Sequence, residues 1–491
     1  ITEGGSRAFM AAYNSWNGIP MSIHPCLEEI TRKQWGNNGI ICTDGGALKL
    51  LIEAHKSFPS FAEGAAAVVK ATTGQFLDAY VPYVKEALEK GLLTEVDIDK
   101  AIRGNIFVAL KLGLLDGDNS RNPYLSIGKN STETPPFMTA EARRLAREVT
   151  AKSVVLLKNK KLLPLDAGKL RKIAVIGPYS DKIVQDWYSG TPPYETTILS
   201  GIRNAVKEGT EIIHAEDNRM GQAEKAAAAA DVAIVCVGNH PYGTRADWKF
   251  SPVPSDGREA VDRKSLMLPD EDLVKLVLKA NPNTILVLVS SFPYTINWSQ
   301  EHVPAIVHIT HCSQEQGNGL ADVLFGKVNP AGRTVQTWVK DITDLPDIMD
   351  YDIRNGRTYM YHQGPVLYPF GYGLSYSDFT YEKIESVKQD KKNIRVTVSV
   401  KNTSGRDGEE VVQLYASYPD SKVERPSKQL RAFRRIPIKA GETRKVTLTV
   451  PKEELGYWNE GKQMFVVEPG TVKLLIGASS EDIRLEGKIR L

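Results

Sequence analysis

The chain has 491 residues, which at about 150 residues per domain predicts about three domains. Its 42% hydrophobic and 25% charged residues are ordinary for a globular protein, and they exclude intrinsic disorder and a small disulfide-stapled scaffold. The 62 Lys and Arg residues nearly balance the 59 Asp and Glu residues. The resulting net charge of +3 argues against nucleic acid or an anionic membrane as the main partner. The longest apolar runs, such as residues 285–289, are too short to span a bilayer.

Residues 1–116 alternate short apolar stretches with helical patterns, which favours a parallel sheet. Strands are predicted at 9–13 and 39–43, and helices at 27–35, 47–56, 81–90 and 98–112. Thr94 and Asp97 form a near capping box at the start of the last helix.

Residues 117–150 comprise a linker rich in Gly, Asn, Ser, Thr and Pro, followed by a helix at 139–150. Residues 151–345 then hold a second alternating set, which predicts a second α/β domain. Its predicted strands are 153–157, 173–176, 211–214, 232–237, 284–289 and 305–310, with helices at 221–230 and 271–280.

Residues 346–380 are rich in Tyr, Gly and Pro and form a connecting segment. From 381 to 491 the pattern becomes all-β. Every second residue of 394–400 is Ile or Val and those between are polar or charged, which is typical of a half-buried strand. Further strands separated by turn residues predict an immunoglobulin-like or fibronectin III-like sandwich.

The cysteines and histidines do not indicate a metal site. The four cysteines include no C-x-x-C pair, and Cys42 and Cys236 lie inside apolar runs, as small buried side chains do. The eight histidines do not make H-E-x-x-H or another metal-ligand spacing. We therefore predict no metal and no cofactor. His240, in G-N-H-P at the end of a predicted strand, is the one histidine that we regard as a candidate site residue.

Two common α/β enzyme classes find little support in the sequence. The predicted strand at 173–176 is followed by G-P-Y-S, which lacks both the G-x-G-x-x-G pattern and a P-loop lysine, so nothing there would hold a diphosphate. A Ser-His-Asp hydrolase would need a G-x-S-x-G turn, which is absent.

The strongest local signal is the segment G-I-I-C-T-D-G-G at 39–46. An apolar strand ends in the carboxylate of Asp44, and in a parallel barrel the carboxyl ends of strands form the active face. Gly45 and Gly46 leave room for a ligand above Asp44. The alternative is that Asp44 only caps the following helix.

A second candidate is the charged loop S-D-G-R-E-A-V-D-R at 255–263. A loop held by a rigid scaffold is a usual place for a catalytic carboxylate, and Glu259, Asp256 and Asp262 are the choices. The alternative is a solvated surface loop with Asp–Arg pairs.

Taken together, these segments resemble glycoside hydrolase family 3, the β-glucosidase and β-xylosidase type, over nearly the whole chain. MAAYNSWNG at 10–18 looks like the family's M-x-x-Y-x-x-x-N-G segment. RKQWGNNGIICTD at 32–44 looks like its R-x-x-W-G-F-x-G-x-V-x-S-D segment, which ends in the nucleophile. EAVDRKSLMLP at 259–269 resembles the loop that carries the acid/base, and NPAGR at 329–333 and YPFGYGLSY at 368–376 complete the pattern.

The resemblance implies three parts: the last strands of a TIM-type (β/α)8 barrel, an α/β sandwich domain and a C-terminal fibronectin III-like domain. It implies a retaining, exo-acting β-glycosidase that removes terminal non-reducing sugars, with glucose as the expected sugar. Asp44 would be the nucleophile and Glu259 the acid/base, and retention needs the two carboxyl groups about 5–5.5 Å apart. The alternatives are a β-xylosidase of the same family and a non-catalytic carbohydrate-binding homologue.

The resemblance also implies substrate-binding side chains. Met10 and Tyr13 would lie beside the nucleophile, although Met10 could equally be barrel core. Trp187, followed by Tyr188, could stack on a sugar face or be buried core. His240 is the fourth candidate contact.

Two departures from the family pattern matter. Gly45 stands where the family often has an aromatic residue, which leaves the choice between glucose and xylose open. The first barrel strands, which carry the family's sugar-binding Asp, Arg and Lys-His residues, have no counterpart here. We therefore expect a missing N-terminal half of roughly 250 residues, by the usual barrel size, as a separate chain of the same enzyme. A secreted or periplasmic location is expected.

Overall fold

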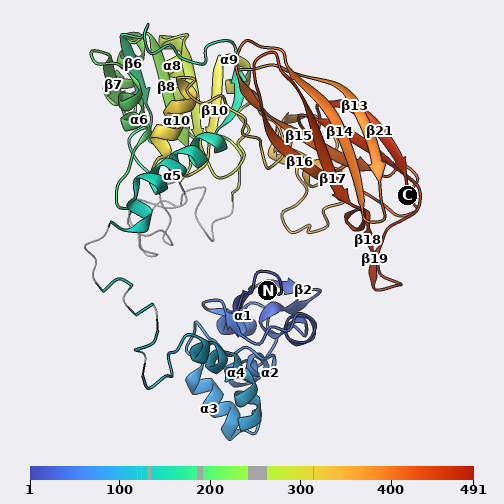
Figure 1. The fold of residues 1–491 in the computed structure, drawn as a ribbon. Coiled ribbons are helices and arrows are strands. Elements are labelled where there is room, and N and C mark those ends of the chain that lie inside the picture. The colour runs from blue at the N-terminus through green and yellow to red at the C-terminus, as the bar shows by residue number, and fades with distance from the viewer. Residues whose placement is uncertain are drawn as a thin grey trace. The chain divides into compact units, whose positions relative to one another are not determined.

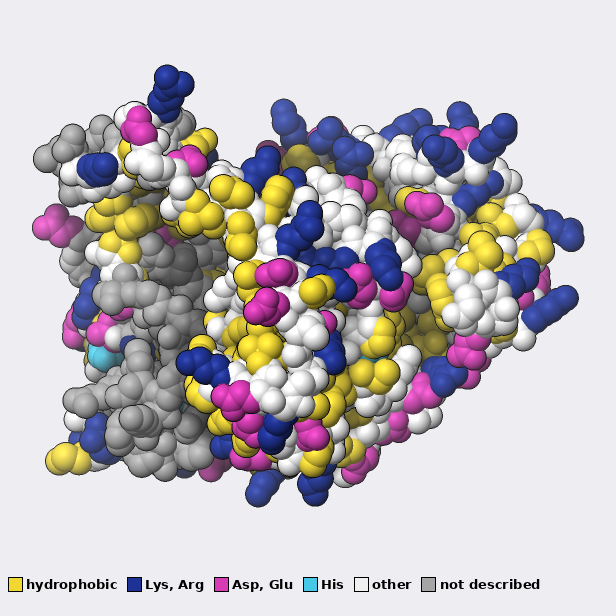
Figure 2. All heavy atoms as spheres, turned by 90° about the horizontal axis from the view of Figure 1, so that it is seen from below, with side chains coloured by type: hydrophobic (Ala, Val, Ile, Leu, Met, Phe, Trp, Pro, Cys, Tyr) yellow, Lys and Arg dark blue, Asp and Glu magenta, His cyan; other side chains and the backbone are white. Residues whose placement is uncertain are grey.

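The computed structural model describes residues 1–118, 120–122, 124–125, 127–129, 134–184, 192–240, 263–312 and 314–491 (Figure 1). The chain forms two compact units, Ile1–Glu133 and Thr134–Leu491, which we call unit 1 and unit 2 and describe separately. In the space-filling view, Lys and Arg side chains are interspersed with Asp and Glu side chains, in keeping with the small net charge (Figure 2).

Unit 1 is organised around two parallel strands, β1 (Ala8–Ala11) and β4 (Ile40–Thr43). Their register sets Met10 opposite Cys42 and Ala11 opposite Thr43. On its other side, Cys42 makes a parallel bridge to Gln75, so a third extended segment runs in the same direction. The predicted strands at 9–13 and 39–43 are therefore both present.

The helices of unit 1 lie between and after these segments. They are the π-helix η2 (Leu27–Gln34), α1 (Ala47–Glu53), α2 (Phe61–Lys70), α3 (Val81–Glu89) and α4 (Glu95–Lys111). A short ribbon, β2 (Ser15–Trp16) with β3 (Ile19–Pro20), and the 3-10 turn η1 (Met21–Ile23) follow β1. The predicted capping box is confirmed, because Thr94 and Asp97 exchange side chain–backbone hydrogen bonds at the start of α4.

Helix α4 packs closely on β4 because of a glycine. A Cβ atom at Gly104 would overlap the carbonyl oxygen of Gly39, the residue that precedes β4. The small residue therefore lets the backbones of α4 and β4 touch, which sets the distance between the helix and the strand.

Unit 2 begins with a six-stranded sheet of order β5-β10-β9-β8-β6-β7 (Figure 1). Its strands are β5 (Val155–Asn159), β6 (Lys172–Ile176), β7 (Glu211–Ala215), β8 (Val232–Gly238), β9 (Thr284–Val289) and β10 (Ala305–Ile309). All neighbouring pairs are parallel except β5 with β10.

Helices cover both faces of this sheet. They are α5 (Ala140–Ser153), α6 (Ile198–Ala205), α7 (Gln222–Ala228), α8 (Glu271–Ala280), α9 (Asn297–His302) and α10 (Gln316–Leu324), with 3-10 turns η3 (Pro136–Met138) and η4 (Arg219–Gly221). Strand β8 shows the two-sided burial: Ile234 and Cys236 pack with residues of α6 and α10, whereas Val235 packs with residues of α7 and α8. A strand buried on both faces is apolar throughout, as β8 and β9 are.

The boundary between the first helix and the first strand of unit 2 differs from the prediction. The sequence predicts a strand at 153–157, but α5 continues through Ser153 and β5 runs from Val155 to Asn159. Ala151 is buried in the core cluster of the sheet, so packing extends the helix past the predicted end at 150.

The connecting segment contains the pair β11 (Trp338–Val339) and β12 (Val366–Tyr368), the 3-10 turn η5 (Ile342–Asp344) and the short helix α11 (Thr358–Tyr361). A β-sandwich follows. Its sheets are β13-β14-β17 and β16-β15-β20-β21. The bounds are β13 (Phe379–Gln389), β14 (Asn393–Asn402), β15 (Gly408–Ser417), β16 (Gln429–Ile438), β17 (Thr443–Pro451), β20 (Thr471–Gly477) and β21 (Ile483–Arg490). The turn η6 (Lys452–Leu455) and the ribbon β18 (Tyr457–Asn459) with β19 (Met464–Val466) complete it.

The alternation predicted over 394–400 is confirmed, since Ile394, Val396, Val398 and Val400 are all buried between the two sheets.

A buried ion pair joins the α/β part of unit 2 to the sandwich. Arg333 Nη2 lies 2.9 Å from Glu410 Oε2, and the two side chains are 9% and 3% exposed. The hydroxyl of Tyr381 donates a second hydrogen bond of 2.9 Å to Oε1 of the same carboxylate. Breaking such a pair strands a charge in a low-dielectric environment, which is costly.

We therefore predict that Glu410→Ala lowers the free energy of unfolding of unit 2 by about 3–5 kcal/mol, the usual cost of removing one partner of a buried pair. The matched control is the preceding residue of the same strand. Glu409 pairs with Arg435, and both side chains are about a quarter to a third exposed, so Glu409→Ala should cost no more than about 1 kcal/mol. Urea unfolding of the two variants measures the difference, and equal losses would contradict the prediction.

Candidate active site

Asp44 follows directly on β4, where the pairing between β1 and β4 ends. The buried residue before it, Thr43, is held by the Gln75 segment: its N–H donates to the Gln75 carbonyl at 3.0 Å, and its hydroxyl accepts from Leu77 N–H at 3.3 Å. Asp44 itself is half-buried. The rigid strand therefore fixes the backbone of Asp44 while leaving its carboxylate at the strand end.

The two glycines after Asp44 leave open space. Apart from the chain neighbours, a Cβ atom at Gly45 or Gly46 would have no described atom within 4 Å, and Gly46 has a φ of +80° that favours glycine. The chain can therefore turn sharply from β4 into α1 without covering the carboxylate.

Asp78, rather than Asp44, binds the amide groups at the start of α1. Its two carboxylate oxygens accept hydrogen bonds from Gly46 N–H and, at 3.2 Å, from Leu48 N–H. The carboxylate of Asp44 accepts only the neighbouring Gly45 N–H, at 2.8 Å, among the hydrogen bonds that the structure describes for it. The side-chain capping role considered for Asp44 is thus carried by a residue that sequence reasoning missed. The sequence carries no local signal for this role, because the extended segment at Gln75 is recognised as a parallel neighbour of β4 only in the structure.

The loop after β1 is tied to the loop after Asp44. The hydroxyl of Tyr13 donates a hydrogen bond to the carbonyl of Gly45. His55 holds the same loop from behind: Nε2 lies 3.0 Å from the Tyr13 carbonyl oxygen, and Nδ1 lies 3.3 Å from Ser15 Oγ. Parallel pairing and these contacts bring Tyr13 and Asp44 to the same end of unit 1.

Met10 lies in β1 opposite Cys42, two residues before Asp44 in the neighbouring strand. The residue is 52% exposed. Burial raises the pKa of the Cys42 thiol, and the charge of Asp44 raises it further. The thiol is therefore neutral at physiological pH and adds no charge beside Asp44.

In unit 2, the carboxyl ends of β6 and β8 form a second candidate edge. β6 pairs with β7 on one side and with β8 on the other, so the order of the strands reverses between β6 and β8, and ligands of open α/β sheets bind at such a point. His240 lies two residues after β8, and Tyr179 follows β6, with the ring centroids 6.2 Å apart. Burial, with a smaller effect of Lys182, lowers the pKa of His240, so its imidazole is neutral at physiological pH.

Several predicted residues lie outside the described residues: Glu259 with the fallback carboxylates Asp256 and Asp262, and Trp187 with Tyr188. The first residue described after the 241–262 segment is Arg263. Its guanidinium carbon lies 3.7 Å from the ring centroid of Phe292 and 4.8 Å from that of Tyr294. Nη1 donates to the Pro293 carbonyl at 3.0 Å. The segment that carries Glu259 thus leads into a firmly held arginine.

Three known protein-family models match this chain. The profile described as "Glycosyl hydrolase family 3 N terminal domain" matches residues 1–104. The profiles "Glycosyl hydrolase family 3 C-terminal domain" and "Fibronectin type III-like domain" match residues 154–376 and 410–480. A periplasmic β-glucosidase of Salmonella typhimurium is 30% identical over 541 aligned positions, which cover 98% of this chain and 67% of that protein.

The chain belongs to glycoside hydrolase family 3.

Further comparisons agree with this assignment. A β-xylosidase of Formosa agariphila is 29% identical, with 98% of this chain and 68% of that protein covered. The solved structure of a β-glucosidase from Erythrobacter marinus aligns with a TM-score of 0.83 and 27% identity, over 100% of this chain and 68% of that one. This family 3 chain spans about two thirds of the length of the relatives that it matches.

Family 3 membership confirms the resemblance that the motifs indicated and makes this chain part of a glycoside hydrolase. The predicted α/β domain and fibronectin III-like domain are likewise confirmed. Within the described ranges, no three His, Cys, Asp or Glu side chains are grouped so that they could hold a metal ion. No helix in those ranges is long and apolar enough to cross a membrane.

Proposed function

We propose that this family 3 chain forms part of a retaining, exo-acting β-glycosidase, which removes terminal non-reducing β-linked sugars, chiefly glucose, from oligosaccharides or glycosides. The observation that carries the proposal is the position of Asp44. Asp44 lies at the carboxyl end of a parallel strand, next to the open space at Gly45 and Gly46. Asp78 accepts the hydrogen bonds from the first amide groups of α1, so the Asp44 carboxylate does not bind them. A carboxylate held in this way is available to a substrate.

In the proposed mechanism, the Asp44 carboxylate attacks the anomeric carbon while the glycosidic C–O bond breaks. Glu259, as the protonated acid, gives its proton to the leaving oxygen. The resulting Glu259 carboxylate then takes a proton from water, the water oxygen attacks the anomeric carbon, and the bond to Asp44 breaks. Two displacements at the same carbon give a product with the configuration of the substrate.

The other site residues receive binding roles in this proposal. Tyr13 and Met10 lie at the end of β1 that faces the Asp44 loop, where they would contact the sugar bound there. His240, kept neutral by burial, can donate a hydrogen bond to a sugar hydroxyl or accept one from it, without adding charge. Trp187 is proposed to stack on a sugar face.

Glucose is proposed from the similarity to proteins named as β-glucosidases, among them that of Salmonella typhimurium, whereas Gly45 by itself leaves the choice between glucose and xylose open. A β-xylosidase is the second candidate, supported by the similarity to the enzyme of Formosa agariphila. The third, a non-catalytic carbohydrate-binding homologue, is disfavoured by the presence of both Asp44 and Glu259.

We also propose that unit 1 is the C-terminal part of a (β/α)8 barrel and is completed by an N-terminal barrel half of the same enzyme, as a separate chain. Two parallel strands and a bridged segment cannot close a barrel of eight strands. Among the described residues β1 pairs with β4 alone, so its other edge is open to a further strand. Large apolar side chains such as Trp16, Trp35 and Leu77 are about half exposed in unit 1, as residues awaiting a partner would be.

A secreted or periplasmic location is proposed from the similarity to a protein named as periplasmic in Salmonella typhimurium.

The nucleophile assignment is tested with a matched pair of variants in the assembled enzyme. Asp44→Ala should lower the hydrolysis of aryl β-glucosides by more than about 10³-fold, as the loss of a nucleophile does, with little change in thermal stability. Asp78→Ala should instead cost about 1 kcal/mol of stability, because the first turn of α1 loses its carboxylate partner. Aryl β-xylosides assayed in parallel decide between the two sugars. Turnover that survives in Asp44→Ala would sink the mechanism.

The acid/base assignment predicts chemical rescue. In Glu259→Ala the glycosyl-enzyme should accumulate on activated aryl glycosides, because no base deprotonates water. Azide needs no deprotonation, so it should restore turnover and yield a β-glycosyl azide. Asp256→Ala and Asp262→Ala are the controls. Rescue of one of these in place of Glu259→Ala would move the assignment to that residue.

The barrel proposal predicts a second polypeptide in the active enzyme. A denaturing gel of the purified enzyme should show, beside this chain, a band of about half its mass, which corresponds to a half-barrel of usual size. Active enzyme that contains this chain alone would contradict the proposal.

A further inference from the structure

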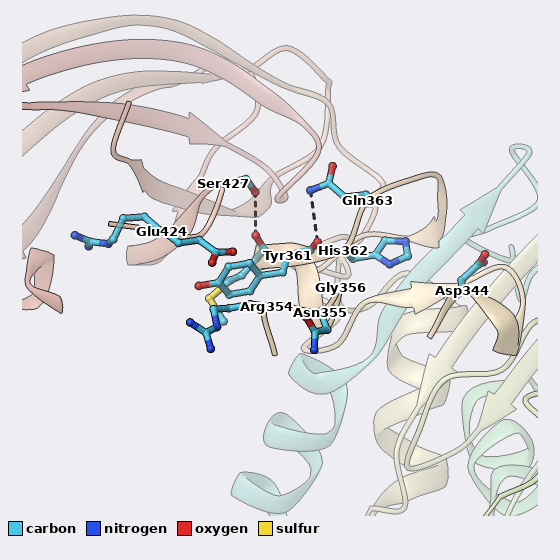
Figure 3. A pocket seen from close by; sticks show the side chains of 11 residues that line it. Asp344, Arg354, Asn355, Gly356, Tyr361, His362, Gln363, Glu424 and Ser427 are labelled. Atoms are coloured by element: carbon cyan, nitrogen blue, oxygen red, sulfur yellow. Dashed lines mark hydrogen bonds between the residues drawn. The ribbon is translucent and has the colours of Figure 1, made fainter. Parts of the chain in front are cut away.

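Unit 2 contains a pocket lined mostly by polar and charged residues at the edge of the sandwich, far along the chain from Asp44 and from the β8 edge. It has a volume of about 530 Å³, within the range of small-molecule sites. One wall is the connecting segment between β11 and β12, including α11, and the other is the chain between β15 and β16. Figure 3 shows Tyr361 in the middle of the lining residues, with Arg354 and Glu424 close to it.

The connecting segment is held in shape by its own side chains. Arg357 donates from Nε to the Asp350 carbonyl at 2.8 Å and from Nη2 to the Asp347 carbonyl at 2.6 Å. Asn355 Nδ2 donates to Asp350 Oδ2 at 2.8 Å. A wall fixed by such contacts binds a ligand without a large loss of conformational entropy.

The two walls are also joined to each other. The backbone N–H and the hydroxyl of Ser427 both donate to the Met360 carbonyl at 3.1 Å (Figure 3). Arg425 is anchored beside them: its guanidinium carbon lies 3.7 Å from the ring centroid of Tyr418, and Nη2 donates to the Leu455 carbonyl at 2.9 Å. The pocket is therefore built before any ligand arrives.

The charges in the lining cancel. Arg354 and Arg425 contribute two positive charges, and Asp344 and Glu424 contribute two negative charges. Arg354 is also paired with Asp352, at 2.5 Å between Nη2 and Oδ2. An anion would gain little from such a lining, and a hydrophobic ligand would strip water from many polar groups without replacing their hydrogen bonds. The lining therefore favours a neutral ligand with many hydroxyl groups.

Tyr361 adds an aromatic face to these donors and acceptors. Burial raises the pKa of its phenol, and the Glu424 carboxylate raises it further, so the hydroxyl stays protonated and can donate. The ring offers an apolar surface next to polar groups, as required by a sugar ring with its C–H face and its rim of hydroxyls.

Two nitrogens in the pocket wall are unsatisfied. Arg425 Nη1 and His362 Nε2 are buried and have no hydrogen-bond partner in the part of the chain that the structure describes. Burying such an atom without a partner is unfavourable. A hydroxyl group both donates and accepts, so it can serve a guanidinium or an imidazole nitrogen once a small side-chain rotation exposes it.

We propose that this pocket is an accessory binding site for a neutral saccharide. It uses none of the residues assigned to catalysis and goes beyond the proposed hydrolytic function. Tyr361 supplies the stacking surface, and Glu424, Arg354 and Asn355 supply the hydrogen bonds to hydroxyl groups.

The test is calorimetric titration of the assembled enzyme with thiocellobiose, a sulfur-linked glucose disaccharide that resists hydrolysis. Tyr361→Ala should weaken binding at the pocket by at least tenfold, whereas Tyr361→Phe should keep it within about threefold, because the ring carries the stacking. Glu424→Gln, at an exposed residue, should weaken binding about tenfold. Tyr351→Ala is the matched control: Tyr351 lies in the same segment, is 78% exposed and does not line the pocket.

Unchanged affinity in both Tyr361→Ala and Glu424→Gln would overturn the proposal, as would stronger binding of glucuronate or inorganic phosphate than of thiocellobiose at this pocket. Thermal unfolding of Tyr361→Ala identifies a folding defect, and in that case Glu424→Gln alone decides. Binding by these variants and hydrolysis by Asp44→Ala are measured in separate assays, so either proposal can fail while the other stands.

Discussion

Parallel pairing between β1 and β4 is the constraint on which the candidate nucleophile site depends. Because neighbouring parallel strands end at the same edge, the register of Met10 with Cys42 carries Tyr13 and Asp44 to one end of the sheet, although 31 residues separate them in sequence. The Gln75 segment continues the same edge on the other side of β4. The close approach of Gly104 to Gly39 sets the distance between α4 and β4. A shift of one residue in any of these contacts would turn Thr43 outward and move Asp44 away from the Tyr13 loop.

Two carboxylates lie near the start of α1, and only that of Asp78 accepts hydrogen bonds from Gly46 and Leu48 N–H at the start of this helix. A helix start needs a partner for its first amide groups, and the nearest acidic residue in sequence is Asp44. The fold supplies Asp78 instead, from the end of the third parallel segment. Asp44 can then remain half-buried and face open space beyond Gly45 and Gly46. The Tyr13 loop is likewise held by a side chain from elsewhere in unit 1, because the His55 imidazole contacts the Tyr13 carbonyl oxygen.

Local patterns in the sequence predict the elements well and their long-range contacts poorly. The apolar runs of β8 and β9, the alternation of β14 and the capping box at Thr94 all depend on neighbours in sequence, and the structure contains each of them. The end of α5 at Ser153 depends on the burial of Ala151 against the sheet, and the bonds of Asp78 bridge about 30 residues. No local pattern reports such contacts. For the same reason, the strand and the two glycines around Asp44 identified it as a candidate, whereas only the structure shows that Asp78 binds the first amide groups of α1 in its place.

Polar groups join the α/β part of unit 2 to the sandwich, and they also line the pocket proposed to bind a saccharide. Arg333 and Tyr381 both donate hydrogen bonds to the buried carboxylate of Glu410, which makes this contact specific. Towards its edge, the connecting segment and the chain between β15 and β16 also carry polar groups, but a space of about 530 Å³ separates part of them. Polar groups packed around such a space must be satisfied by water or by a ligand that imitates water. A saccharide meets that requirement, because its hydroxyl groups replace several waters at once while its ring covers Tyr361. The polar character that joins the two parts thus also leaves a binding site at the edge of their junction.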